Sequence, residues 1–138
     1  MDAAFHGKTL REAILAPTRL YVKPMLELMK QVKVKGIAHI TGGGLTENIP
    51  RILQDGLTAI IQKNTWPRPP LFSWLQEHGN VAESEMHRVF NCGVGMVLVV
   101  DKKDASAALD LLKRQGETVW SIGSIEKQAP GQAKIVVV

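Results

Sequence analysis

A glycine-rich loop between a predicted strand and a predicted helix is the part of this sequence best suited to chemistry. The stretch His39–Arg51 reads HITGGGLTENIPR. Glycines let a backbone approach a phosphate closely, and the unpaired amides and the dipole at the start of a helix favour an anion. Asn48 and Arg51 lie one helical turn apart, so both side chains could reach one ligand. Because the loop matches neither the P-loop spacing nor the dinucleotide fingerprint, anion binding and a plain tight turn remain equally good interpretations.

The remaining reactive side chains give weaker indications. His39 could act as an acid, a base or a phosphate donor because its pKa lies near neutrality, or it could simply be hydrogen-bonded at a strand end. His6, His78 and His87 lack the spacing of metal ligands and are expected at the surface. Cys92, the single cysteine, has no basic neighbour in the sequence, so we expect it to be buried rather than nucleophilic.

Two pairs of turn-forming residues have structural interpretations. Gly93 and Gly95 precede a strand rather than a helix, which favours close backbone packing inside the sheet over ligand binding. Pro67 and Pro70 fit a rigid turn before a helix better than a polyproline ligand.

The elements that position these residues follow from the spacing of apolar and turn-forming residues. Helices are expected over 9–16, from Pro24 through Val32, from about Thr46, through Phe72–Leu75 as far as Gly79, over 82–90, and from Asp104 to Gly116. Strands are expected over 36–41, 57–61, 94–100, 119–125 and 134–138. This mixture predicts an α+β fold, a layered α/β domain with a mixed sheet.

Several details of these elements can be predicted as well. Thr46 is the expected N-cap of the helix after the glycine loop, with Pro50 in its first turn. The strand 94–100 is the most apolar and is expected at the centre of the sheet. One face of the second helix is expected in the core, carrying Met25, Leu26, Met29 and Val32.

Composition bounds the class of protein. A chain of 138 residues with 45% hydrophobic and 22% charged residues is expected to form one soluble domain, residues 1–138. The net charge of +4 is scattered, so nucleic acid is not a required partner, while small anions are favoured. One cysteine excludes an internal disulfide, and no apolar run reaches the length of a membrane span. We therefore expect a cytoplasmic location without a signal peptide or membrane contact.

Longer motifs in a fixed order resemble a known family. They are APTRLYVK at 16–23, AHITGGG at 38–44 with ENIPR at 47–51, GNV at 79–81, and EMHRVFNCGVGM at 85–96. Together they resemble phosphoribosylformylglycinamidine cyclo-ligases, also named aminoimidazole ribonucleotide synthetases, over their carboxy-terminal domain. The resemblance runs from about Gly7 to the final valines.

The resemblance implies a role in de novo purine biosynthesis. In that family ATP phosphorylates the formyl oxygen of formylglycinamidine ribonucleotide, and the amidine nitrogen then closes the imidazole ring. An earlier domain, absent here, supplies most of the ATP and magnesium contacts and forms a homodimer, so the isolated chain is expected to be inactive. The residues implied to face the cleft between the domains are Thr41, Gly42, Gly43, Gly44, Asn48 and Arg51, with Arg19 as a further candidate and His39 as the candidate catalytic group.

Two other functions remain open from the sequence. A noncatalytic module could use the same glycine loop to hold a phosphorylated metabolite. A relative in the same superfamily, such as an amidotransferase subunit or a kinase-like protein, could keep the fold and change the substrate, because a fold does not determine a function.

Overall fold

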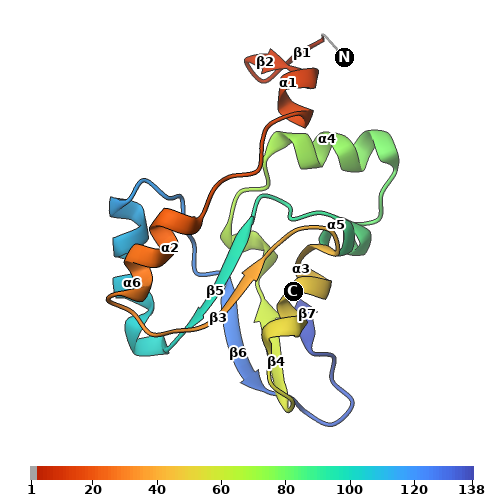
Figure 1. Cartoon of the computed structure of the whole chain (residues 1–138). Coiled ribbons are helices and arrows are strands. Elements are labelled where there is room, and N and C mark those ends of the chain that lie inside the picture. The colour runs from red at the N-terminus through yellow and green to blue at the C-terminus, as the bar shows by residue number, and fades with distance from the viewer. Residues whose placement is uncertain (1–2) are drawn as a thin grey trace.

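The computed structural model describes residues 3–138. The chain starts with a short hairpin, β1 (Ala4–Phe5) and β2 (Lys8–Thr9), followed by α1 (Leu10–Ile14). Thr9 and Glu12 form a capping box at the start of α1, in which each side chain accepts from the backbone amide of the other residue. This segment lies beside α4 (Pro70–Gly79), where the Phe5 ring meets Trp74 edge to face (Figure 1).

A two-stranded ribbon forms one half of the fold. In it β3 (Val34–His39) pairs antiparallel with β5 (Met96–Val100). Two helices, α2 (Val22–Met29) and α6 (Ala105–Arg114), lie together on one side of the ribbon (Figure 1), and the 3-10 turn η3 (Lys102–Asp104) leads into α6. Their contact buries Met25, Leu28, Val32, Ala108, Leu111 and Leu112.

A three-stranded sheet forms the other half. Its central strand β4 (Leu57–Ile61) pairs antiparallel with β6 (Gly123–Lys127) and parallel with β7 (Ile135–Val137). The sheet is therefore mixed, which confirms the predicted fold class. A second core lies between this sheet and the ribbon and buries Ala38, Ile40, Leu45, Ile49, Ala59, Ile61, Trp66, Val94 and Val97.

Short helices close the end of this second core. After β3 the chain forms α3 (Gly44–Asn48) and the 3-10 turn η1 (Ile49–Ile52), and after β4 it forms the 3-10 turn η2 (Lys63–Thr65). The helix α5 (Glu83–Val89) packs against α3. Leu45 and Ile49 fill the space under α3, which anchors the glycine loop to the core.

Three of the predictions about elements are wrong in detail. The strand 94–100 is not central, since β5 pairs with β3 alone among the described residues. The strand predicted over 119–125 starts only at Gly123 and continues to Lys127, because the preceding residues cross from α6 to the sheet. The inner face of α2 carries Met25 and Leu28, while Leu26 and Met29 are exposed. Within residues 3–138, no helix is long and apolar enough to cross a membrane.

Candidate functional site

Three segments that are far apart in the sequence meet where β3 ends and β5 begins. The Ile40 amide donates to the Gly95 carbonyl at 2.9 Å. The Tyr21 ring meets the His39 ring edge to face, with centroids 5.8 Å apart. A methyl group at Gly95 would lie 2.0 Å from the Tyr21 hydroxyl oxygen, so a larger residue there would have to displace this tyrosine. The motifs quoted above for residues 16–23, 38–44 and 85–96 therefore lie together in space.

His39 is exposed at the end of β3, opposite Met96. Its neighbour Tyr21 is half-buried, and burial raises the pKa of the Tyr21 hydroxyl further above neutrality. A protonated phenol can donate a hydrogen bond to an oxygen anion beside the imidazole. Tyr21 was not among the predicted site residues, although it lies inside the APTRLYVK motif at 16–23 that carries the resemblance.

The glycine loop is open on one side and tightly packed on the other. Thr41 and Gly42 are exposed, and a methyl group at Gly42 would meet nothing within 4 Å. Gly43 has a φ of 96°, in the left-handed region, and is the N-cap of α3. Gly44 is buried, and a methyl group there would lie 2.2 Å from the carbonyl oxygen of His87. A methyl group at Gly43 would lie 2.7 Å from the Glu47 Oε2. The three glycines thus have different roles, and only Gly42 borders open space.

Asn48 holds the loop from inside. Its side chain is buried, and Nδ2 donates to the carbonyl oxygens of Thr41, Gly42 and Gly44 at 3.4, 3.1 and 2.8 Å. The Arg51 Nη1 donates to the Asn48 Oδ1 at 3.1 Å. Because this one amide gathers three loop carbonyls, Asn48 fixes the shape of the loop, and Arg51 remains on the surface above it.

The predicted N-cap at Thr46 is wrong. The N-cap is Gly43, three residues earlier, and the helix begins at Gly44, because the left-handed conformation of Gly43 ends the loop there. The Thr46 hydroxyl donates instead to the His87 carbonyl at 3.4 Å, which ties α3 to α5. Pro50 lies near the start of η1 rather than in the first turn of α3.

Arg19 lies apart from the glycine loop. Its guanidinium forms a two-pronged ion pair with Glu117, with Nε and Nη2 at 2.8 and 3.0 Å from the carboxylate oxygens. It also borders a cavity of about 1120 Å³ between the β3–β5 ribbon and β6. None of the other predicted site residues lines this cavity among the residues described.

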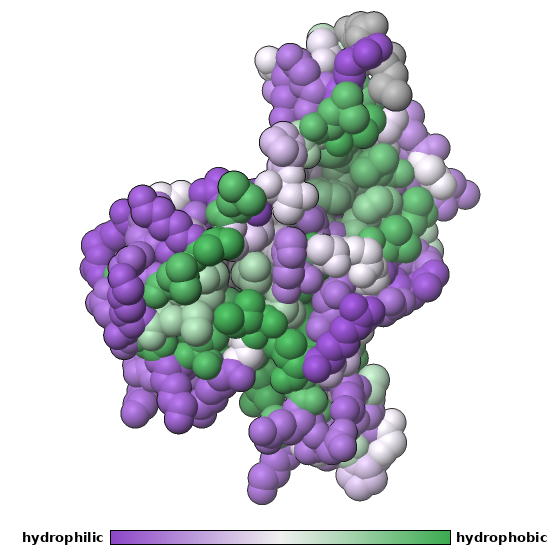
Figure 2. All heavy atoms as spheres, in the orientation of Figure 1, coloured by the Kyte–Doolittle hydropathy of each residue, from purple (hydrophilic) through white to green (hydrophobic). Residues whose placement is uncertain are grey.

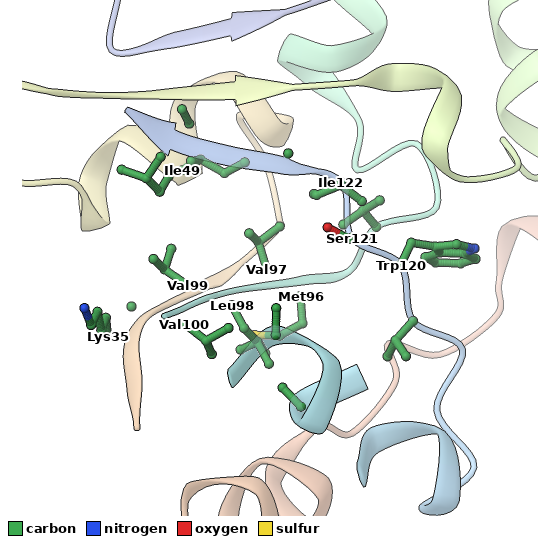
Figure 3. Close-up of a pocket in the computed structure, with 18 of the residues that line it drawn as sticks. Lys35, Ile49, Met96, Val97, Leu98, Val99, Val100, Trp120, Ser121 and Ile122 are labelled. Atoms are coloured by element: carbon green, nitrogen blue, oxygen red, sulfur yellow. The ribbon is translucent and has the colours of Figure 1, made fainter. Parts of the chain in front are cut away.

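The walls of the cavity are mainly apolar. Figure 3 shows Val97 and Val99 on the side of β5 that faces Ile49 and Ile122, with Trp120 at one end of the view and Lys35 at the other. Such walls suit apolar groups, whereas the open loop at Gly42 suits an anion. The cavity and the loop are thus two separate features.

A polar network beside the site involves a histidine that was expected at the surface. His87 is buried, because α5 turns it toward the Trp66 ring, and its Nε2 lies 3.4 Å from the Glu83 Oε1. This burial lowers the pKa of His87. Hydrogen bonds from Arg68, with a smaller contribution from Gln76, lower the pKa of Glu83 to about 2. Glu83 and His87 are four residues apart, which is the only signal in the sequence for this pair.

The residues after α5 confirm the predicted burial of Cys92 but not the predicted packing of the two glycines. Cys92 is fully buried, its Sγ donates to the Met86 carbonyl at 3.4 Å, and burial raises the pKa of the thiol. The prediction that Gly93 and Gly95 pack against backbone inside the sheet is wrong, because both precede β5 and their close neighbours are the Pro69 ring and the Tyr21 side chain. Within residues 3–138 no group of three or more His, Cys, Asp or Glu side chains is arranged to hold a metal ion.

The fold and the site together define an α+β domain with a glycine-loop site at the end of a strand. A sequence profile described as "AIR synthase related protein, C-terminal domain" matches residues 2–136. The chain therefore belongs to the carboxy-terminal domain family of AIR synthase related proteins.

Relatives and a solved structure agree with this family. The chain is 60% identical over all 138 residues to proteins named phosphoribosylformylglycinamidine cyclo-ligase from Cupriavidus metallidurans and from Paraburkholderia phymatum. It spans 39% of the length of each of these relatives. The crystal structure of E. coli HypE matches 93% of this chain and 40% of its own with a TM-score of 0.61 at 16% identity, which supports the fold alone.

Proposed function

We propose that this chain is the carboxy-terminal domain of an ATP-dependent cyclo-ligase that converts formylglycinamidine ribonucleotide to aminoimidazole ribonucleotide. The observation that carries the proposal is the 60% identity to proteins of that name over the whole chain. In the reaction ATP supplies the phosphoryl group that activates the formyl oxygen, and the amidine nitrogen then closes the ring. The enzyme would act in the cytoplasm as a homodimer.

The exposed side of the glycine loop is the proposed contact for the ribonucleotide phosphate. Thr41 and Gly42 border open space, and Gly43 gives the backbone its turn there. Asn48 and Gly44 hold the loop in shape, one by hydrogen bonds and the other by close packing. We thus divide the predicted binding residues into those that touch the ligand and those that shape the loop.

The charged and titratable groups nearby have proposed roles as well. Arg51 lies above the loop, where its guanidinium can reach a phosphate. His39, with Tyr21 beside it, is the proposed proton-transfer group, because its exposed ring faces solvent at the end of β3. Arg19 is held by Glu117 and would reach a ligand only at the mouth of the cavity.

The preceding domain would supply most of the ATP contacts and the magnesium site. The open side of the glycine loop, which offers a place for a phosphate, supports this division. This domain would then act on the substrate side of a cleft shared with its neighbour.

The test is to mix this chain with the separately produced amino-terminal domain and to measure ATP-dependent imidazole formation. We expect activity from the mixture and none from either part, since half a cleft cannot exclude water or orient a phosphoryl group. A verified folded complex that stays inactive would contradict the proposal. The alternative is a noncatalytic module that binds a phosphorylated metabolite. Calorimetry of the isolated chain with ribose 5-phosphate distinguishes it from the cyclo-ligase domain, because such a module would bind a phosphate ester without the second domain.

A further inference from the structure

The helix α2 is apolar on two faces. Its inner face buries Met25 and Leu28 against α6. Its outer face carries Val22, Leu26 and Met29, whose spacing of four and three residues puts them in one stripe. These three side chains are 68%, 57% and 52% exposed.

Charged side chains occupy a third face of the same helix. Lys23, Glu27 and Lys30 follow one another at the same helical spacing, and the Lys30 Nζ lies 2.7 Å from the Glu27 Oε1. A surface helix of a folded protein usually exposes only its polar face to solvent. A helix that is apolar over most of its circumference is usually covered by other parts of the protein or by a partner. The outer stripe therefore has the composition of a covered face.

Neighbouring residues extend the stripe into a patch. Leu20, just before α2, is 85% exposed, and Ile37 on β3 is 40% exposed. We define the α2 patch as Leu20, Val22, Leu26, Met29 and Ile37. Figure 2 shows apolar surface over α2 and toward the β3–β5 ribbon on this side of the molecule. Contiguous apolar surface of this kind marks an interaction site.

We propose that the α2 patch docks against the part of the enzyme chain that precedes this domain. The relatives are much longer than this chain, which covers 39% of their length, and the family is a carboxy-terminal domain. The remaining length therefore lies upstream. The family match covers residues 2–136, so the patch at residues 20–37 lies in the amino-terminal part of this domain.

The size of the patch favours a tethered neighbour over a second copy of the domain. A stable interface between separate proteins takes about 20 to 30 residues on each side, far more than the five of the α2 patch. A neighbour in the same chain is held at an effective concentration of about millimolar, so a small apolar contact suffices. The proposal rests on family membership and on the length of the relatives, and it does not depend on which reaction the enzyme catalyses.

Cysteine labelling tests this docking directly. Cys92 is the only cysteine of the chain and is fully buried. A cysteine placed in the patch is therefore the only thiol of the 138-residue chain that is exposed to the labelling reagent. The variants are Leu26→Cys and Met29→Cys, both at exposed positions outside the buried cores. Val138→Cys is the matched control, since Val138 is 56% exposed, close to the 57% of Leu26. Each is treated with a maleimide in the 138-residue chain and in the full-length enzyme chain, and peptide mapping measures the labelling rate at that position.

We expect Leu26→Cys and Met29→Cys to label at least about tenfold more slowly in the full-length chain, because the covering domain must open first. Val138→Cys should label at the same rate in both. Equal rates for the two patch variants in the short and long chains would overturn the proposal. So would a labelling rate in the short chain that falls as protein concentration rises, since that result assigns the patch to a second copy. Activity is not the readout, so failure of the proposed reaction leaves this test unaffected.

Discussion

Replacing Gly44 by alanine tests whether this glycine is required for packing. The added methyl group would lie 2.2 Å from the His87 carbonyl oxygen and 2.7 Å from that of Phe90. Both partners are backbone atoms of α5 or of its C-cap, so neither can rotate away. Gly44 also has a φ of 54°, in the left-handed region. The variant must therefore move α3 away from α5 and strain its own backbone.

The two costs can be estimated separately. A left-handed backbone costs an alanine about 1 to 2 kcal/mol, and a close-packed contact forced to accept a methyl group costs about 1 to 3 kcal/mol. The sum of about 2 to 5 kcal/mol is a large part of the roughly 5 to 15 kcal/mol that stabilises a typical domain. For a chain of this length we expect the unfolding midpoint to fall by roughly 6 to 15 °C in calorimetry or circular dichroism.

Gly42→Ala is the matched control for this prediction. It changes the same residue type two positions earlier, where a methyl group meets nothing within 4 Å. We expect its stability to stay within about 1 kcal/mol of the parent chain, because an alanine without strain also restricts the unfolded chain. If Gly44→Ala were as stable as the parent, or if Gly42→Ala lost just as much, the assigned difference between the two glycines would be wrong.

Three further predictions concern residues around the loop and α5. Asn48→Ala leaves the loop carbonyls without their shared donor and should lower the free energy of unfolding in urea by about 1 to 3 kcal/mol, whereas Arg51→Ala should change it by less than about 0.5 kcal/mol; equal effects would contradict the role given to Asn48. Glu83 has a pKa of about 2 in the folded chain against an ordinary value of 4.5, so its stabilising contribution is complete above pH 4.5 and is lost as the pH falls toward 2. Urea midpoints measured across that range should therefore fall less steeply for Glu83→Gln, and parallel curves would argue against the network with Arg68. Native Cys92 should react with a thiol reagent only as fast as the domain opens, because burial both shields the thiol and raises its pKa; rapid labelling in the absence of urea would refute this.

Local sequence patterns predicted the elements that local interactions define. The strand over residues 57–61 has the predicted bounds, and Cys92 is buried, as expected for a single cysteine without a basic neighbour in the sequence. The fold class also followed, because alternating strand and helix patterns are short-range signals. The position of the glycine loop between β3 and α3 followed for the same reason.

The errors arose where distant segments decide the outcome. Thr46 has a good capping side chain, but contact with α5 and the turn at Gly43 start the helix earlier. His87 looks like a surface histidine until α5 is seen to pack beside Trp66. Leu26 and Met29 match a core pattern, yet the described residues leave them exposed. Tyr21 lies 18 residues before His39, so no local sequence pattern predicts the contact between their rings.

The hydrogen bonds from Asn48 bear on the entropic cost of binding a ligand at the loop. Its amide already orders the loop in the unliganded chain, so little conformational entropy is left to lose on binding. A preorganised loop does not close over a bound ligand, so its backbone would have nearly the same conformation in the free and bound states. Any gate that shields the reacting atoms from water must then belong to a different element from this turn.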